Sequence, residues 1–285
     1  MWQMADNELT SPASTFQYLR ACRLLVVDGK NNALDLSELH IKFSVKHSDN
    51  MTPNVADIRV YNLAEETALK IRKEFKQVVL EAGYQGNYGV IFQGNIKQVI
   101  LGRESATDTF IDIVAGDGEN AYNFSVINST IAKGATSTDQ VQAASTSLAT
   151  KGVSQGYINN PNTQALPRGK VMFGNARDYL RSIAQATGQN WSIQNGKLNY
   201  IPRKSYLPGE ALKLTSKTGM IGTPQQTNEG VNIKCLLNPR IKTSGRIWID
   251  NKSIALYKIN FSVPGSPANI PPPINADGVY FVLIV

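Results

Sequence analysis

Histidine and cysteine are scarce, with two of each in 285 residues. His40 and His47 lie seven positions apart on one predicted strand, so their side chains point to opposite faces and cannot share a ligand or a catalytic centre. Cys22 and Cys235 each lie in an apolar run, without a CxxC or Cys/His pairing that could hold a metal ion. We therefore predict no metal site and two buried free thiols in a reducing compartment.

Long apolar runs are also missing. The longest, such as Val279–Val285, are far shorter than the roughly 20 residues of a membrane-spanning helix. Residues 1–9 are polar and acidic, unlike a secretory signal, which has a basic stretch followed by an apolar one. We expect a protein that is made and kept soluble in a cytoplasm, without stable membrane association.

The positive charge is not concentrated in one place. The formal net charge is +7, but most lysines and arginines are spread singly through strand-like segments. The densest basic cluster alternates with glutamates, as in a solvated helix face; it comprises Lys70, Arg72, Lys73 and Lys76 with Glu65, Glu66 and Glu74. This pattern favours solubility and docking to acidic partners over nucleic-acid binding.

Motifs of known chemistry are absent as well. Gly83, Gly86 and Gly89 lack the spacing and the following Lys-Ser/Thr of a phosphate-binding loop, and no serine lies in a Gly-x-Ser-x-Gly elbow. Three carboxylate pairs are candidates for a glycosidase or calcium centre: Glu65 with Glu66, Asp108 with Asp112, and Asp117 with Glu119. Each pair has an ordinary structural interpretation. We predict no enzyme, and no catalytic, cofactor-binding or metal-binding residue.

Strand patterns dominate what is present. Residues 39–47 alternate strictly between apolar and polar side chains, which is typical of a half-buried antiparallel strand. Further strands are predicted at 22–27, 57–63, 78–82, 90–100 and 109–115, with a helix at 64–73, its inner side near Leu69 and Ile71, and a glycine-rich hairpin at 83–89. Residues 16–125 therefore form a first β-domain of six strands, after a flexible arm at 1–15.

The sequence pattern changes in residues 126–205, where helix, loop and hairpin signals predict a small α/β module. A helix at 138–150, capped by Ser137 or Thr138, precedes a mobile loop at 152–169. A second helix begins after Asn175 and ends at Gly188, and a type I′ hairpin turns at Asn195-Gly196. A linker at 202–209 leads to strands at 212–214, 231–237, 246–249, 256–261 and 279–285, with a proline-rich loop at 264–273.

Several soft patterns follow one another along the chain: DIRVYNL (57–63), VLEAGY (79–84), VIFQGNIK (90–97), DIVAGDGE (112–119), LTSKTGMIG (214–222), GVNIKCLL (230–237) and DGVYFV (277–282). In this order they resemble the central hub protein of contractile-tail phage baseplates. They are similar to the T-even hub and to the hub part of the type VI secretion spike. The likeness covers most of residues 16–285.

The resemblance implies two tail-tube-like antiparallel β-barrel domains, at 16–125 and 206–285, with the α/β module of 126–205 between them. It implies a homotrimeric ring that adapts a sixfold tail tube to a threefold spike and surrounds the DNA channel of a virion, assembled in the host cytoplasm. The implied partners are tail-tube or tube-adaptor proteins, the spike, neighbouring baseplate proteins and the tape measure, with DNA only in transit. The second barrel departs from the family pattern because it is short.

Three other interpretations remain open at this point. A tail-tube or tail-completion protein would need only one barrel per chain and would assemble with sixfold symmetry. A cell-wall-degrading tail hydrolase would use carboxylates such as Glu65, Asp117 and Glu119. A nucleic-acid-binding module ranks below both, and a binding curve with little salt dependence would exclude it.

Overall fold

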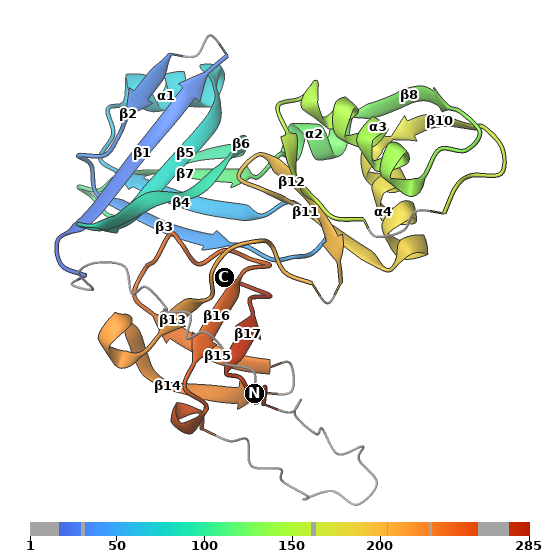
Figure 1. Ribbon diagram of the computed structural model, residues 1–285. Coiled ribbons are helices and arrows are strands. Elements are labelled where there is room, and N and C mark those ends of the chain that lie inside the picture. Colours follow the sequence, from blue (N-terminus) through green and yellow to red (C-terminus); the bar gives the residue numbers. More distant parts are fainter. Residues whose placement is uncertain (1–16, 30–31, 161–163, 204, 228–229, 256–273) are drawn as a thin grey trace, which may run out of the picture.

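The structure is a computed structural model that describes residues 17–29, 32–160, 164–203, 205–227, 230–255 and 274–285. Within these ranges it has seventeen strands and four α-helices, which form three lobes (Figure 1). The prediction of a mainly β fold is confirmed. The predicted arm at 1–15, the strand at 256–261 and the loop at 264–273 lie outside the described residues.

The first lobe is one antiparallel sheet with the strand order β2-β1-β5-β6-β7-β4-β3. Its strands are β1 (Arg20–Asp28), β2 (Ala33–Asp35), β3 (Ile41–Lys46), β4 (Val55–Tyr61), β5 (Phe75–Tyr84), β6 (Asn87–Arg103) and β7 (Thr109–Gly116). Among the described residues β2 and β3 do not pair, so the sheet is open and the predicted barrel at 16–125 is wrong. A barrel closes only when its edge strands pair along their length, and β2 has only three residues.

Alternating side chains give this sheet its core. In β3, Ile41, Phe43 and Val45 are partly buried and pack on the core, while the intervening Lys42, Ser44 and Lys46 are exposed. The helix α1 (Glu65–Glu74) covers the sheet through Ala68 and Ile71, which are buried. The prediction that Leu69 faces inward is wrong, because it is 39% exposed. Helical periodicity places position 68, not 69, three residues from Ile71 on the same face.

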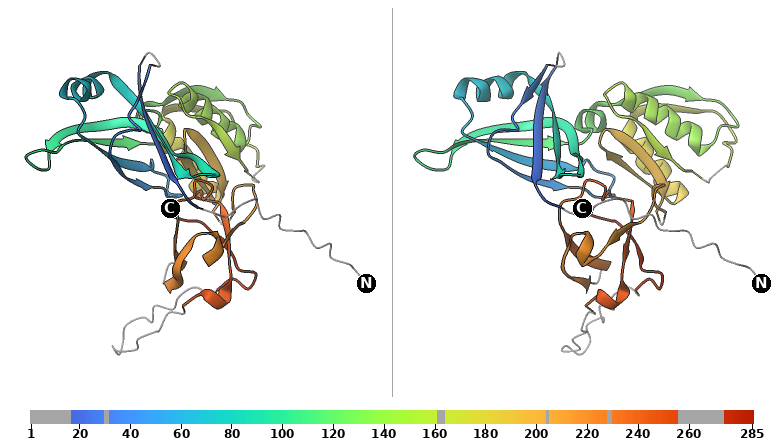
Figure 2. Two further views of the ribbon diagram at one scale, coloured as in Figure 1. Left: turned by 90° about the vertical axis from the view of Figure 1, so that its left-hand side faces the viewer. Right: turned by 60° about the vertical axis from the view of Figure 1, so that its left-hand side comes forward.

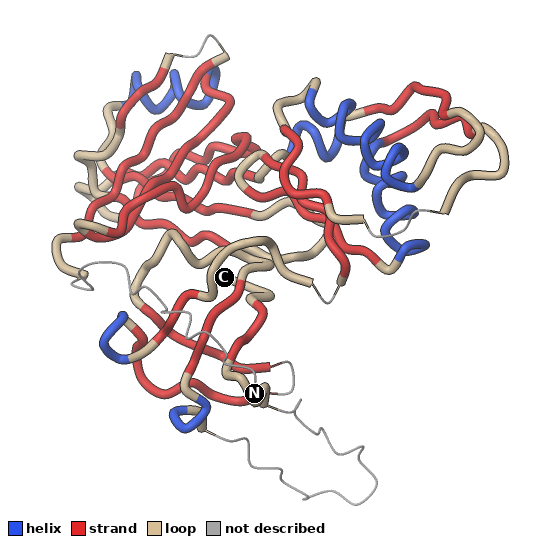
Figure 3. Tube along the Cα trace, viewed as in Figure 1, coloured by secondary structure: helices blue, strands red, loops and turns tan. Residues whose placement is uncertain are grey.

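The middle lobe contains most of the helical structure (Figure 3). Its helices are α2 (Glu119–Phe124), α3 (Ser137–Ala149) and α4 (Ala176–Thr187). Its strands form two small sheets: β8 (Val126–Ile131) with β10 (Lys170–Asn175), and β9 (Ser154–Ile158) with β12 (Lys197–Pro202) and β11 (Gln189–Gln194). Sixteen buried side chains, from Ala121 to Tyr200, form its core. None of the helices in the described ranges is long and apolar enough to cross a bilayer.

The ends of α4 and the β11–β12 turn are as predicted, whereas the start of α3 and the loop at 152–169 differ from the prediction. Asn175 caps α4, with its Oδ1 accepting from the Arg177 N–H at 3.2 Å, and Gly188 ends the helix in a left-handed conformation. Asn195 and Gly196 both have positive φ, as a type I′ turn requires. The cap of α3 is Thr136 rather than Ser137 or Thr138. The predicted loop at 152–169 contains β9, which pairs with β12 in parallel.

The C-terminal lobe, from residue 205 onward, is the smallest (Figure 2). Its strands are β13 (Leu212–Leu214), β14 (Met220–Thr227), β15 (Gly230–Cys235), β16 (Arg246–Ile249) and β17 (Val279–Phe281), with short 3₁₀ helices at Ser216–Thr218 and Asn251–Ser253. They form one sheet of three strands and one of two, so the predicted barrel at 206–285 is not closed within the described residues. The predicted strand 279–285 is interrupted after Phe281.

Candidate functional site

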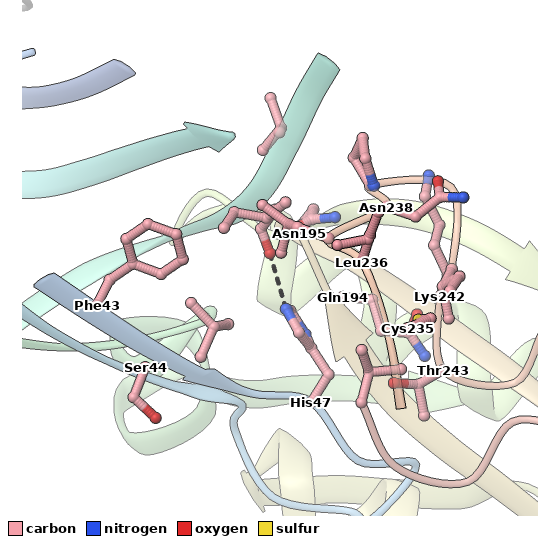
Figure 4. Close-up of a pocket in the computed structure, with 17 residues that line it drawn as sticks. Phe43, Ser44, His47, Gln194, Asn195, Cys235, Leu236, Asn238, Lys242 and Thr243 are labelled. Carbon is pink, nitrogen blue, oxygen red and sulfur yellow. Dashed lines mark hydrogen bonds between the residues drawn. The ribbon is translucent and has the colours of Figure 1, made fainter. Parts of the chain in front are cut away.

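The three lobes meet around a cavity of about 360 Å³ (Figure 4). Its walls come from β3, from the beginning of β6, from the end of β11 and from the segment that follows β15. The lining residues are Phe43, Ser44, Val45, His47, Val90, Ile91, Gln194, Asn195, Cys235, Leu236, Leu237, Asn238, Pro239, Ile241, Lys242, Thr243 and Val285. Segments from all three predicted domains therefore contribute to one site.

Asp117 joins the first lobe to the middle lobe on one side of this site. Its carboxylate accepts the backbone N–H of Gly196 at 2.8 Å and that of Asn195, the two residues of the β11–β12 turn. Burial raises the pKa of Asp117 to about 6, although the hydrogen bonds from Gly196, Asn195 and Asn54 lower it. The side chain thus orients a turn that lies 78 residues further along the chain.

Two amide side chains reinforce the same joint. Asn54 donates from Nδ2 to the Ile193 carbonyl at 3.0 Å, and its Oδ1 accepts from the Ser48 N–H at 2.9 Å. Asn190 donates from Nδ2 to the Asp49 carbonyl at 2.6 Å. Asn54 is buried and Asn190 is partly buried, and their hydrogen bonds fix the relative position of the segments that they connect.

The last residues of the chain join the C-terminal lobe to the first lobe. The N–H of His47 donates to the Val285 carbonyl at 2.8 Å, and the N–H of Val285 donates to the His47 carbonyl at 2.9 Å. Ser48 and Ile284 form an antiparallel bridge beside this pair. Residues 283–285 thus form a short added strand along residues 47–49, which continue the line of β3.

The imidazole of His47 is held at the cavity wall. Its Nε2 lies 2.8 Å from the Ile91 carbonyl, to which it donates (Figure 4). Burial lowers the pKa of His47, and the hydrogen bond to Ile91 opposes this shift. His47 therefore remains neutral to a lower pH than a solvated histidine and stabilises the contact between β3 and β6.

Most of β3 has a free edge beside the cavity. The Tyr61 N–H donates to the His40 carbonyl at 3.0 Å, and the register pairs Lys42 with Arg59 and Ser44 with Asp57. In an antiparallel ladder the residues between such pairs point their N–H and C=O groups the other way. The backbone groups of residues 41, 43 and 45 therefore face the free edge, as do those of His47, and no described residue bonds to the first three.

The charged side chains that line the cavity and its neighbour are all basic. Lys242 lines it, and an adjoining hollow is lined by Lys197, Arg240 and Lys242. Neither lining contains an aspartate or a glutamate. On β3 itself, Lys42 and Lys46 are exposed. The site thus combines an open strand edge, apolar walls and positive charge.

The structure does not bring the candidate catalytic carboxylates together. Glu65 and Glu66 lie in the first turn of α1. The others have separate partners: Asp112 accepts from Arg59 at 2.7 Å, Glu119 pairs with Lys97 at 3.1 Å, and Asp108 accepts from Ser105 at 2.8 Å. In the described part of the chain, no three His, Cys, Asp or Glu side chains group as metal ligands.

The remaining scarce residues also lie apart. The ring of His40 stacks on Tyr61 with centroids 4.7 Å apart, away from the cavity that His47 lines. Cys22 and Cys235 are both free thiols, as predicted, and both are partly buried. Burial raises the pKa of each thiol, which favours the less reactive protonated form.

The sequence did not predict that β3 and the segment 235–243 line a common cavity. The alternation of residues 39–47 predicts the strand, but alternation is the same for an edge strand and for an inner one. The dipeptide Asn238-Pro239 predicts a turn, but it does not indicate that this turn lies across the cavity from β3. Asp117 was considered as a catalytic group, whereas it bonds to a distant turn.

A family model described as "Baseplate hub gp41" matches residues 24–255. No curated protein matches the chain by sequence. Among solved structures, the chain is similar to the 43 kDa tail protein of prophage MuSo2 from Shewanella oneidensis, at 10% identity and a TM-score of 0.46. That alignment covers 81% of this chain and 72% of the Shewanella chain.

Two other structures are similar over a comparable length. A tail protein from Neisseria meningitidis MC58 has 13% identity and a TM-score of 0.47, with 73% of this chain and 63% of that chain covered. An E. coli component of the type VI secretion system has 11% identity and a TM-score of 0.45, with 75% of this chain and 65% of that chain covered. This chain therefore spans slightly less than two thirds of these two proteins.

Proposed function

The chain belongs to the baseplate hub gp41 family, and from this premise we propose that it is a structural hub subunit of a phage-tail baseplate. In this proposal three copies form a ring that adapts the sixfold tail tube to the threefold spike and surrounds the channel for DNA. The observation that carries the proposal is the family match, which extends over most of the chain, residues 24–255.

The open first sheet supports assembly into a ring. Its edges, β2 and β3, are not paired with each other within the described residues. Unpaired edges promote association with other chains, and closure of a ring would cover them.

We propose that residues 16–125, 126–205 and 206–285 are three structural units of this subunit. The three hydrophobic clusters support this division, because they follow one another along the chain in the same order. The proposed partners are the tail tube or its adaptors, the spike, neighbouring baseplate proteins and the tape measure. The ring would be a virion component, with most lysines and arginines facing outward or toward protein partners.

We propose further that the subunit is not an enzyme. Asp117 is engaged by two backbone N–H groups, Glu119 by Lys97 and Asp112 by Arg59. These contacts give each carboxylate a structural role. A muramidase assay of the purified chain tests the alternative, and activity that is lost in an Asp117→Asn or a Glu119→Gln variant would establish the hydrolase.

Native mass spectrometry of the full chain, alone and mixed with its candidate spike, tests the ring. A trimer, or a complex of three hub chains with three spike chains, is the expected result. A hexamer would favour a tail-tube protein instead. A monomer under both conditions would contradict the ring and leave the hydrolase assay as the next measurement.

A further inference from the structure

We propose that the outer face of the β8–β10 sheet binds an amphipathic α-helix of another protein, which lies across the two strands and carries acidic residues at one end. The surface comprises Phe124, Val126, Val171 and Phe173 and is called the β8–β10 face below. Figure 1 shows β8 and β10 at the outer end of the middle lobe, away from the first sheet and from the C-terminus. The inference therefore goes beyond the ring, whose closure concerns the edges of the first sheet.

Exposed apolar side chains are the first argument. Four large ones on this face are between 55% and 71% exposed: Phe124, Val126, Val171 and Phe173. The register places Phe173 opposite Asn128 and Val171 opposite Thr130, two and four positions after Val126, so these side chains share one face. A sheet face in water normally carries polar side chains. The four offer on the order of 400 Å² of apolar surface, a patch size that often marks a functional surface.

The opposite face shows which kind of element this sheet accepts. Ile127 and Met172 are buried there, in the same core as Val141 and Leu148 of α3 and Leu180 of α4. The sheet is thus already covered by helices on one side (Figure 1). A helix on the β8–β10 face would cover its second apolar face in the same way.

The strand edges argue against an added strand as the cover. The Tyr179 hydroxyl accepts the Phe173 N–H at 3.0 Å and donates to the Phe173 carbonyl at 3.3 Å, which closes the outer edge of β10 at this residue. A strand added beside β8 would lie in the plane of the sheet and leave the β8–β10 face in water. A helix about 10 Å wide covers two strands about 4.8 Å apart, and about 13 helical residues match the roughly 20 Å of a six-residue strand such as β8.

Charge identifies the chemistry of the partner. Segments 124–133 and 164–175 contain three cations, Lys133, Arg168 and Lys170, and no aspartate or glutamate. All three lie toward one end of the sheet, because Lys170 is paired with Ile131, the last residue of β8. A second copy of this chain packed on this face would bring the same cations and no carboxylate. A helix with glutamates or aspartates at that end complements them.

The first test uses two capped, fluorescein-labelled peptides of 14 residues and the full chain. One forms a helix with four leucines on a single face and three glutamates in its first turn, where they also stabilise the helix. The other has the same composition, with its leucines distributed around the helix. Fluorescence anisotropy measures binding, and we expect the first peptide to bind at least about tenfold more tightly than the second.

Substitutions at exposed positions locate the binding surface. Val171→Thr combined with Phe173→Thr removes apolar groups and keeps side chains suited to a strand. This double variant should bind the first peptide at least about tenfold more weakly, whereas Ile221→Thr, at an exposed apolar residue of β14, should bind it normally. Lys133→Glu should weaken binding about threefold or more, and Lys151→Glu, at another exposed lysine of the middle lobe, should leave it unchanged.

Equal binding of the two peptides, unchanged binding by the double variant, or no binding at about 1 mM peptide would overturn the proposal. Vesicles of anionic lipid test another occupant. Binding of the chain to them that is lost in the double variant would assign the β8–β10 face to a membrane surface and refute the helix.

Native mass spectrometry of the double variant separates this site from the ring. We expect the variant to form the same oligomer as the unaltered chain. A variant that loses the trimer would assign the β8–β10 face to a contact between copies and refute the proposal, while the ring would stand. A monomeric chain that still binds the first peptide through Val171 and Phe173 would refute the ring and support the helix site.

Discussion

The first lobe and the C-terminal lobe are both built from strands, but they differ in how their cores are made. Fifteen buried side chains form the core of the first lobe, between its seven-stranded sheet and α1, whereas five form the core of the C-terminal lobe, which has one sheet of three strands and one of two. Small cores bury too little apolar surface to offset chain entropy easily. The C-terminal lobe therefore depends on its contacts with the first lobe, among them the pairing of residues 283–285 with 47–49.

The strongest way to test this difference is to remove a central side chain of the first lobe. Ile113 is fully buried in β7, between β4 and β6. We expect Ile113→Ala to lower the free energy of unfolding by about 4 kcal/mol, because neighbouring strands on both sides prevent the cavity from collapsing. Urea unfolding followed by far-ultraviolet circular dichroism measures this loss, and the fluorescence of Trp248 reports on the C-terminal lobe. A Trp248 transition that is unchanged in Ile113→Ala would contradict the dependence of the C-terminal lobe on the first lobe.

Asp117 tests the joint that the first lobe makes with the middle lobe. Its folded pKa of about 6 lies above the unfolded value of 3.8, so the folded state holds a proton that the unfolded state releases between these pH values. Its contribution to stability is therefore full below pH 3.8 and is lost as pH rises through 6. The stability of the wild type relative to Asp117→Asn should fall by about 3 kcal/mol across this window.

Urea unfolding at pH 4, 5, 6 and 7 measures this relative stability. Asp178→Asn is the matched control, since Asp178 is an exposed aspartate of α4. A flat difference between wild type and Asp117→Asn would show that the carboxylate is ionised throughout this range and that its two N–H bonds outweigh burial.

A third substitution, Ile249→Ala, addresses the C-terminal lobe itself. Ile249 is fully buried in β16 but has few buried neighbours. We expect the free energy of unfolding to fall by about 2 kcal/mol, less than for Ile113→Ala, because a cavity with few packed neighbours collapses more completely. The transition reported by Trp248, which lies beside it in the sequence, should shift, while that of Trp191 should not. An equal shift of both would show that the lobes unfold as one.

His47 gives the smallest expected effect. Its folded pKa lies below 6.5, so the unfolded state takes up a proton first as pH falls. Its contribution is present above pH 6.5 and is lost as pH falls, which is opposite to the sign for Asp117. His47→Gln can keep the donor to the Ile91 carbonyl and removes the titration. The midpoint of the Trp248 transition, compared between pH 7.5 and 5.5, should therefore depend less on pH in the variant.

Most strands of the first lobe were predicted from their alternating pattern, and the strands that were missed lack this pattern. In β10, Val171 and Phe173 are exposed although apolar, and Met172 between them is buried. Both faces are thus apolar and the period of two disappears. In β8 and β9, serine, asparagine and glutamine occur among the few apolar residues, so these strands resembled loops. The barrels were expected from the resemblance, and strand length in β2 prevents closure in one chain.

The candidate site was less predictable than the fold. The roles of Asp117 and His47 depend on partners 79 and 44 residues away. Nothing at positions 116–118 indicates that the carboxylate will meet the turn at 195–196. That the chain has no catalytic centre stays a prediction, and the structure shows that Asp112 and Glu119 have separate basic partners.

Local patterns in the sequence were enough to predict the alternation of β3, the Asn175 cap and Gly188 end of α4, and the Asn195-Gly196 turn. These features depend on hydrogen bonds and side-chain directions within a few residues. The position of β3 at the edge of its sheet, and its neighbour at residues 47–49, became visible only in the folded chain. Strand pairing depends on packing between distant segments, and the periodicity of one segment does not encode its neighbour.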